Sequence, residues 1–100
     1  MDLRRLIKEA WHGRAVIHVG KQGVTESVLA EIKRQLEARK VVKVRLLKSC
    51  IEREGKTRRE LARMIAEKVG ARLVGIRGYA FVLCIDPRAK GGRARAGASA

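Results

Sequence analysis

The sequence predicts an α/β domain with its elements in the order α-β-α-β-α-β-β. Three observations support this order: apolar residues recur at helical spacing in three segments, short β-branched segments lie between those helices, and two further strand-like segments close the pattern. Strands joined through helices should lie parallel with right-handed crossovers, while a closing pair of strands should be antiparallel. We therefore expect a four-stranded mixed sheet packed with three helices.

The first expected helix covers residues 2–11 and has Asp2 at its N-cap. Its apolar face repeats at helical spacing through Leu3, Leu6, Ile7 and Ala10. The next segment, RAVIHV at residues 14–19, is short and β-branched, which is typical of a buried strand. These two elements begin the alternation of helices and strands.

The second helix is expected to begin after Thr25, whose hydroxyl can cap it, and to continue to residue 40. Glu26 places a negative charge in the first turn, where the positive end of the helix dipole lies. The segment VVKVRLL, residues 41–47, then alternates between apolar and basic residues. This alternation predicts a strand that buries one face and turns Lys43 and Arg45 to the other.

A third helix is expected after a polar linker, KSCIEREGK, at residues 48–56. The string TRRE at residues 57–60 matches a capping box, in which a threonine side chain and a glutamate side chain each bond the other residue's backbone amide. Thr57 should therefore begin this helix, and Gly70 stands where a helix commonly ends.

The C-terminal third begins with two strand-like runs, ARLVGIR at residues 71–77 and YAFVLCI at residues 79–85. Their separation by Gly78 is short enough to predict an antiparallel hairpin. Residues 86–100, DPRAKGGRARAGASA, have no apolar period and contain three glycines and the only proline. We expect a folded domain over residues 1–85 and a disordered basic tail over residues 86–100.

The charge of the chain is strongly positive. Its 24 Lys and Arg against ten Asp and Glu give a net charge of +14, of which residues 86–100 carry only +3. The larger share therefore belongs to the expected folded domain, and such an excess attracts polyanions, most commonly nucleic acid. A surface adapted only for solubility would usually hold acidic residues in similar number. We expect a nucleic-acid partner and no small-molecule substrate.

The cysteines and histidines give no sign of a metal or cofactor site. Cys50 and Cys84 lie 34 residues apart without a CxxC motif, and His12 and His18 have no partner at ligand spacing. Two lone thiols indicate a reducing compartment, which leads us to expect a cytoplasmic protein; a disulfide between them stays open as an alternative. No apolar run approaches the roughly 18 residues of a membrane span, so we expect no membrane partner.

The segment GKQG joins the first expected strand to the second helix. Gly20 and Gly23 allow the backbone to bend and remove the Cβ atoms that would hold a phosphodiester away, while Lys21 adds a charge and Gln22 a hydrogen-bonding group. Amides at a helix start attract anions, and a GxxG loop clamps the backbone of nucleotides in the KH module. An ordinary turn, in which glycine serves only the geometry, is the alternative interpretation.

The stretch VIHVGKQGVTESVLAEIKRQLEARKVVKVRLL, with the closing GARLVGIRGYAFVLCI, resembles the CRM domain, named for chloroplast RNA splicing and ribosome maturation. The resemblance covers about residues 3–85 and rests most on the string GKQGVTE. It implies an RNA-binding domain similar in fold to the C-terminal domain of a translation initiation factor. Bacterial members with a single domain are associated with precursors of the large ribosomal subunit, and plant members with group II intron splicing.

Further candidates for RNA contact lie outside the loop. Lys43 and Arg45 could extend a track of phosphate contacts along their strand, although a solvated strand face would look the same. Arg58 and Arg59 stand at the start of the third helix, where cations oppose the helix dipole, so a functional reason for them is favoured. The full predicted RNA-binding set is Gly20, Lys21, Gln22, Gly23, Thr25, Lys43, Arg45, Arg58 and Arg59.

Three classes of function compete for this sequence. An RNA-binding protein that assists ribosome assembly or RNA folding, with large-subunit ribosomal RNA or its precursor as partner, fits the loop, the charge and the resemblance. A small basic chromatin protein that coats duplex DNA is the alternative, and preference for structured RNA over duplex DNA separates the two. An enzyme is disfavoured, because no acid–base pair or metal-binding constellation stands out among the ten acidic residues.

Overall fold

The computed structural model describes residues 3–85. Its elements along the chain are α1 (Leu3–His12), β1 (Ile17–Val19), α2 (Glu26–Arg39), β2 (Val41–Leu46), α3 (Lys48–Glu54), α4 (Arg58–Val69), β3 (Arg72–Arg77) and β4 (Ala80–Cys84). The four strands form one sheet in the order β1-β2-β4-β3. The α/β class and the four-stranded sheet predicted from the sequence are thereby confirmed.

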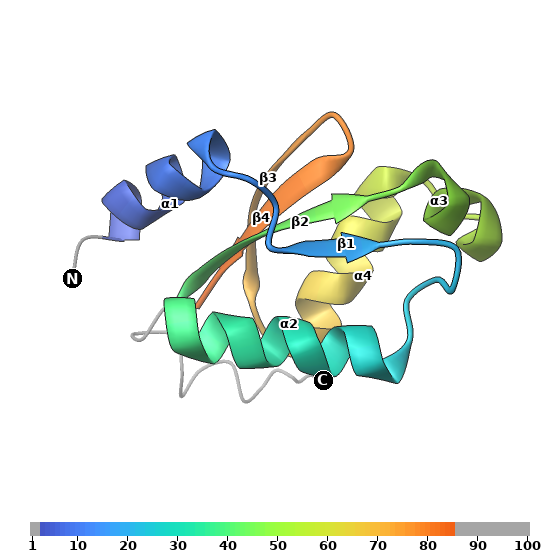
Figure 1. Ribbon diagram of the computed structural model, residues 1–100, viewed down its shortest axis with the longest axis horizontal. Coiled ribbons are helices and arrows are strands. Elements are labelled where there is room, and N and C mark those ends of the chain that lie inside the picture. The colour runs from blue at the N-terminus through green and yellow to red at the C-terminus, as the bar shows by residue number, and fades with distance from the viewer. Residues whose placement is uncertain (1–2, 86–100) are drawn as a thin grey trace.

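The sheet is mixed, as the order of elements predicts. Strand β2 runs parallel to β1 and antiparallel to β4, and β4 is also antiparallel to β3. Strands β2 and β3 therefore point the same way, although β4 lies between them. Helices α2 and α4 lie on one face of the sheet and α1 on the other, while α3 lies at the end of β2 beside the segment that follows β1 (Figure 1).

The structure corrects two expectations: it adds one helix and shortens the first strand. The expected polar linker contains the helix α3, which spans seven residues, buries Cys50 and ends at Gly55 in the left-handed conformation with φ 67°. A helix this short contains too few apolar residues to show a periodic pattern, so the count of three helices was wrong by one. The first strand is also shorter than expected, because only Ile17–Val19 pair with β2.

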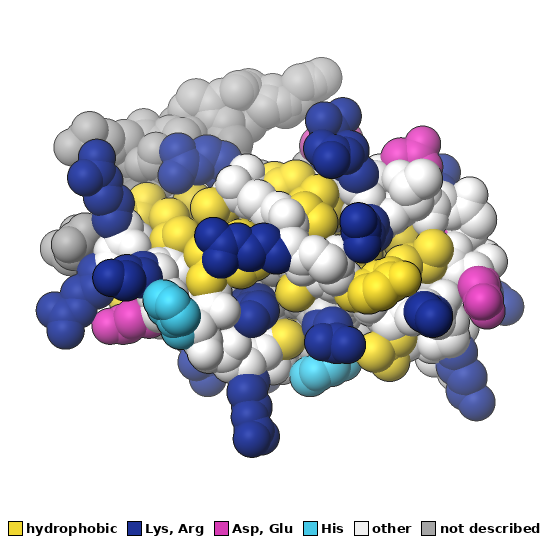
Figure 2. Space-filling model, turned by 90° about the horizontal axis from the view of Figure 1, so that it is seen from above, with side chains coloured by type: hydrophobic (Ala, Val, Ile, Leu, Met, Phe, Trp, Pro, Cys, Tyr) yellow, Lys and Arg dark blue, Asp and Glu magenta, His cyan; other side chains and the backbone are white. Residues whose placement is uncertain are grey.

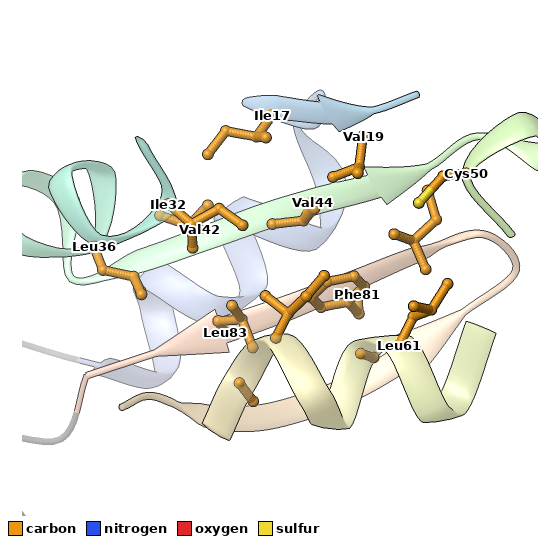
Figure 3. Close-up of a cluster of buried hydrophobic side chains, with 14 residues drawn as sticks. Ile17, Val19, Ile32, Leu36, Val42, Val44, Cys50, Leu61, Phe81 and Leu83 are labelled. Atoms are coloured by element: carbon orange, nitrogen blue, oxygen red, sulfur yellow. The ribbon is translucent and has the colours of Figure 1, made fainter. Parts of the chain in front are cut away.

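The main core fills the space between the sheet and the helices α2 and α4. It unites Val42, Val44 and Leu46 of β2 with side chains of β1, β4 and both helices (Figure 3). Phe81 of β4 and Leu61 of α4 are fully buried. The capping box predicted for α4 is present: the amide of Thr57 donates to Glu60 Oε1 over 2.9 Å, and the amide of Glu60 donates to Thr57 Oγ1 over 3.1 Å.

A second, smaller cluster lies on the opposite face, beneath α1. Val41, Val82 and Cys84 are its buried members, and α1 covers them with its apolar stripe and with Trp11. This packing of Trp11 agrees with the helix amphipathicity seen in the sequence. Because α1 contacts mainly β2 and β4, it leaves part of this face open.

Some expectations fall outside the described residues, namely the N-cap at Asp2 and the tail over residues 86–100. Among residues 3–85, no helix combines the length and the apolar character needed to cross a bilayer.

Both cysteines are free and buried, but they belong to different clusters on opposite faces of the sheet. Burial raises the pKa of the Cys50 thiol, and the nearby Glu54 carboxylate raises it further. We therefore predict that a thiol reagent labels neither cysteine in the native protein near neutral pH, and that both react once urea unfolds the chain. Labelling followed by mass spectrometry checks this; rapid native labelling of Cys50 would contradict its burial.

Candidate nucleic-acid interface

Three connections meet at one end of the sheet, which we call the loop end: Gly20–Gly23, Leu47 and Gly78–Tyr79. The first two come together because β1 and β2 are parallel, so that the segments after them leave from the same end. The hairpin turn joins them because β4 is antiparallel to β2 and begins where β2 finishes, with Ala80 opposite Arg45. The amide of Leu46 donates to the carbonyl oxygen of Tyr79 over 2.7 Å and fixes this junction.

The GKQG segment forms a tight turn in which the amide of Gly23 donates to the carbonyl oxygen of Gly20 over 2.9 Å. Lys21 and Gln22 occupy the tip and are exposed, whereas Gly23 is buried. Neither tip side chain has a hydrogen bond or ion pair with any other residue in 3–85. The turn therefore presents one cationic and one amide side chain to solvent.

The two glycines of the loop serve different purposes. Gly23 has φ +80°, and a Cβ atom built on it would lie 2.5 Å from Glu54 Oε2 and 3.1 Å from Arg53 Cγ, so the fold itself requires glycine there. Gly20 lacks a positive φ, and a Cβ atom on it would make only ordinary contact with Leu47 Cδ1 at 3.4 Å. Internal packing therefore does not explain the glycine at position 20.

A carboxylate of the chain itself already occupies part of the loop. Glu54, at the end of α3, accepts a hydrogen bond from the backbone amide of Val24 over 2.7 Å. In the first turn of α2, the amide of Val28 is bonded to Thr25 Oγ1 over 3.2 Å, so Thr25 is the N-cap that the sequence predicts. The expectation that these helix-start amides are open to a phosphate is therefore corrected for Val24 and Val28.

Beside the loop, one row of side chains crosses all four strands on the open part of the sheet. Register pairs His18 with Arg45, Arg45 with Ala80, and Ala80 with Arg77, which places all four on one face. We call these four residues the open row. His18, Arg45 and Arg77 are exposed, and the guanidinium of Arg77 lies 4.3 Å from the centre of the Trp11 ring. The row is continuous with the loop, because Gly20 follows β1 directly.

The open row itself contains no acidic residue. Within residues 3–85 every Asp or Glu lies on one of the four helices, and the strands and the GKQG loop contain none. Figure 2 shows a face on which Lys and Arg side chains lie among apolar atoms, while acidic side chains stand near its margins. The open row therefore has no neutralising carboxylate among its own residues, whereas the loop has Glu54 at its exit.

Lys43 shares the face of Arg45 but is engaged within the protein. Its Nζ donates to the carbonyl oxygens of Trp11 and Gly13, each over 3.0 Å. These are carbonyls at the end of α1 that have no partner within the helix. The structure thus assigns Lys43 a role in fastening α1 to the sheet, in addition to any contact with RNA.

The two arginines at the start of α4 differ in their surroundings. The Cζ atom of Arg58 lies 5.5 Å from the centre of the Tyr79 ring, which brings this arginine to the loop end of the sheet. Arg59 is exposed and has no such contact with the loop end among the described residues. The structure therefore places Arg58 beside the hairpin turn at the loop end and Arg45 in the open row, on the face of the sheet opposite to α4, and within residues 3–85 it shows no contact of Arg59 with either.

Four residues of this surface were not predicted from the sequence, namely Leu47, Lys48, Glu54 and Tyr79. Tyr79 follows the hairpin glycine Gly78, and an aromatic residue in a tight turn is the signal that could have identified it. Nothing in the sequence signals Glu54, since its partner Val24 is 30 residues away. No group of three His, Cys, Asp or Glu side chains placed to hold a metal ion occurs within residues 3–85.

Comparisons with known proteins show similarity to a domain family and to proteins described as RNA-binding. The model of the CRS1 / YhbY (CRM) domain family matches residues 1–84. A probable RNA-binding protein of Methanocaldococcus jannaschii is 35% identical over 80 residues, which are 80% of this chain; the match spans 58% of that longer relative. A hypothetical protein of Staphylococcus aureus, a candidate RNA-binding protein solved in solution, superposes with a TM-score of 0.64 and 26% identity over 83% of this chain and 82% of its own.

The different demands on the two loop glycines predict different effects on stability. Gly23→Ala should lower the free energy of unfolding by at least about 1–2 kcal/mol, the cost of a left-handed conformation for a residue with a Cβ atom, whereas Gly20→Ala should change it by less than about 0.5 kcal/mol. Urea denaturation followed by circular dichroism measures both. Equal losses would contradict the left-handed conformation assigned to Gly23. Substitution of Gly23 is thus a poor test of phosphate contact, since it disturbs the loop itself.

Lys43 and Arg45 form a second matched pair. Lys43→Met should lower the free energy of unfolding by about 1–2 kcal/mol, because two carbonyl oxygens at the end of α1 lose a charged donor. Arg45→Met, on the same face but without such contacts, should stay within about 0.5 kcal/mol of the unmodified protein. Denaturant titration distinguishes them; a larger loss from Arg45→Met would refute the assignment of Lys43 to the end of α1.

Proposed function

The chain belongs to the CRS1 / YhbY (CRM) domain family, and we propose that it binds structured RNA through the GKQG loop and the open row. The single observation that carries the proposal is the exposed tip formed by Lys21 and Gln22, whose side chains have no partner among residues 3–85 and which is continuous with the open row across the sheet. Gly20 supports it, because the fold alone does not need a glycine there. A phosphodiester can approach the backbone closely at this position only because no Cβ atom is present.

The proposed contacts are made to the sugar-phosphate backbone more than to base edges. Lys21 and the arginines of the open row are suited to phosphates, and Gln22 can donate to a phosphate or accept from a 2′-hydroxyl. Contacts of this kind position a protein on RNA without reading its sequence. Selectivity for structured RNA then comes from shape, that is, from the spacing between the loop and the open row.

The partner class is proposed from the family resemblance. Large-subunit ribosomal RNA or its precursor is the proposed partner, and assistance to ribosome assembly or RNA folding is the proposed role, by binding without catalysis. Crosslinking of the protein to RNA in its own cells, followed by sequencing of the attached RNA, tests this part. Recovery of messenger or transfer RNA alone would contradict it while leaving the interface intact.

The interface itself is tested by charge removal at the tip and in the row. Lys21→Ala and Arg45→Ala should each weaken binding to a structured RNA about fivefold, the upper end of what one exposed ion pair contributes. Each should also make the dependence of affinity on salt less steep by about one charge, because one fewer counterion is displaced. Lys33→Ala is the control: Lys33 is exposed on α2, away from the loop and the open row. Electrophoretic or fluorescence binding assays over a range of salt provide the readout.

Two results would count against this interface. Equal losses from Lys33→Ala and Lys21→Ala would mean that only net charge matters. Tighter binding to duplex DNA than to structured RNA at the same salt concentration would favour a chromatin-like role instead.

A further inference from the structure

A shallow hollow lies at the loop end, between α3, the start of α4 and the hairpin turn. Its volume is about 330 Å³, and it is lined by Lys48, Ile51, Glu52, Thr57, Arg58 and Tyr79. These residues come from α3, the start of α4 and the hairpin turn, three parts of the chain that meet only at the loop end. The hollow is open to solvent and holds both an aromatic ring and two cations.

Tyr79 is the unusual member of this lining. Its side chain remains 37% exposed, although it stands in a tight turn where a small polar residue would serve. Its backbone carbonyl, not its ring, makes the hydrogen bond that fixes the turn to β2. Arg58 lies over the ring at 5.5 Å. The hydrogen bond that fixes the turn therefore does not depend on the ring.

A second exposed apolar side chain links the hollow to the loop. Leu47 is 38% exposed, and its Cδ1 lies 3.4 Å from the position of a Cβ on Gly20. The amide of Leu47 donates to the carbonyl oxygen of Val19 over 2.9 Å, which holds it next to the start of the loop. Leu47 thus lies between Gly20 and the hairpin turn, because the preceding residue, Leu46, is bonded to the carbonyl oxygen of Tyr79.

We propose that this hollow receives an unpaired nucleobase of the bound RNA, held against Tyr79 and the guanidinium of Arg58, while Lys48 contacts a flanking phosphate. The proposal rests on the RNA-binding function proposed above and adds a subsite to it. Unpaired bases of structured RNA commonly stack on exposed aromatic rings and arginine planes. The exposed ring, which a phosphate would not use, favours a base as the occupant of the hollow.

The experiment compares two RNA hairpins with the full chain. One hairpin has an ordinary single-stranded loop, and the other has the same ribose-phosphate loop with its bases removed. Stacking on one aromatic ring contributes enough that Tyr79→Ala should weaken binding to the intact hairpin about fivefold or more, while binding to the abasic hairpin stays unchanged. Tyr79→Phe keeps the ring and should bind both hairpins as the unmodified protein does. Neither change removes the backbone carbonyl that fixes the turn.

The outcomes separate the subsite from the function on which it rests. The proposal is upheld if Tyr79→Ala abolishes the preference for the intact hairpin and leaves the salt dependence unaltered. It is overturned if Tyr79→Ala affects both hairpins equally, as a phosphate in the hollow would require, or affects neither while Lys21→Ala weakens both. If Lys21→Ala and Arg45→Ala also leave both affinities unchanged, the RNA-binding interface itself is refuted.

Discussion

The hydrogen bond from the amide of Val24 to the carboxylate of Glu54 is the contact on which the proposed interface depends. It joins the exit of the GKQG loop to the end of α3, two segments that the parallel pairing of β1 and β2 places at the same end of the sheet. With this amide satisfied inside the protein, the turn is held against α3 and only its tip projects. The anion that a helix start attracts is here a side chain of the protein, and RNA is left with Lys21, Gln22 and the bare backbone at Gly20. The loop is thus positioned before any ligand arrives, which reduces the conformational entropy lost on binding.

The distribution of charged residues makes the same surface positive. Among residues 3–85 the acidic side chains stand on the helices, so that the part of the sheet that α1 leaves uncovered is positive without local compensation. This face of the sheet has two parts, one that packs against α1 and one that is exposed to solvent. Its α1 half is closed by the cluster around Val41 and Cys84 and fastened by Lys43, while the half nearer the loop keeps Arg45 and His18 exposed. Lys43 and Arg45, two residues apart, therefore carry the same kind of charge for different purposes.

The sequence predicted most of the fold because its signals are local. The cap at Thr25, the capping box at Thr57 and the alternation in residues 41–47 each predict their element from neighbouring residues, and the structure confirms all three. The helix α3 was missed because seven residues with few apolar members show no period. The candidate site was predicted less fully, because most of its hydrogen bonds and side-chain contacts join segments that are distant in the sequence. Register and chain crossing, which no local pattern encodes, bring Glu54 to Val24 and Tyr79 to Leu46. The assignment of all nine residues of the predicted RNA-binding set as RNA contacts stays a prediction.

Amide chemical shifts of the ¹⁵N-labelled full chain, followed while a structured RNA is added, test the central claim most directly, because they report each position without any substitution. The account predicts that the largest changes fall on Gly20, Lys21, Gln22 and Arg45, with little change on the outer faces of α2 and α4. Changes concentrated on those two helices, with the loop amides unmoved, would contradict it.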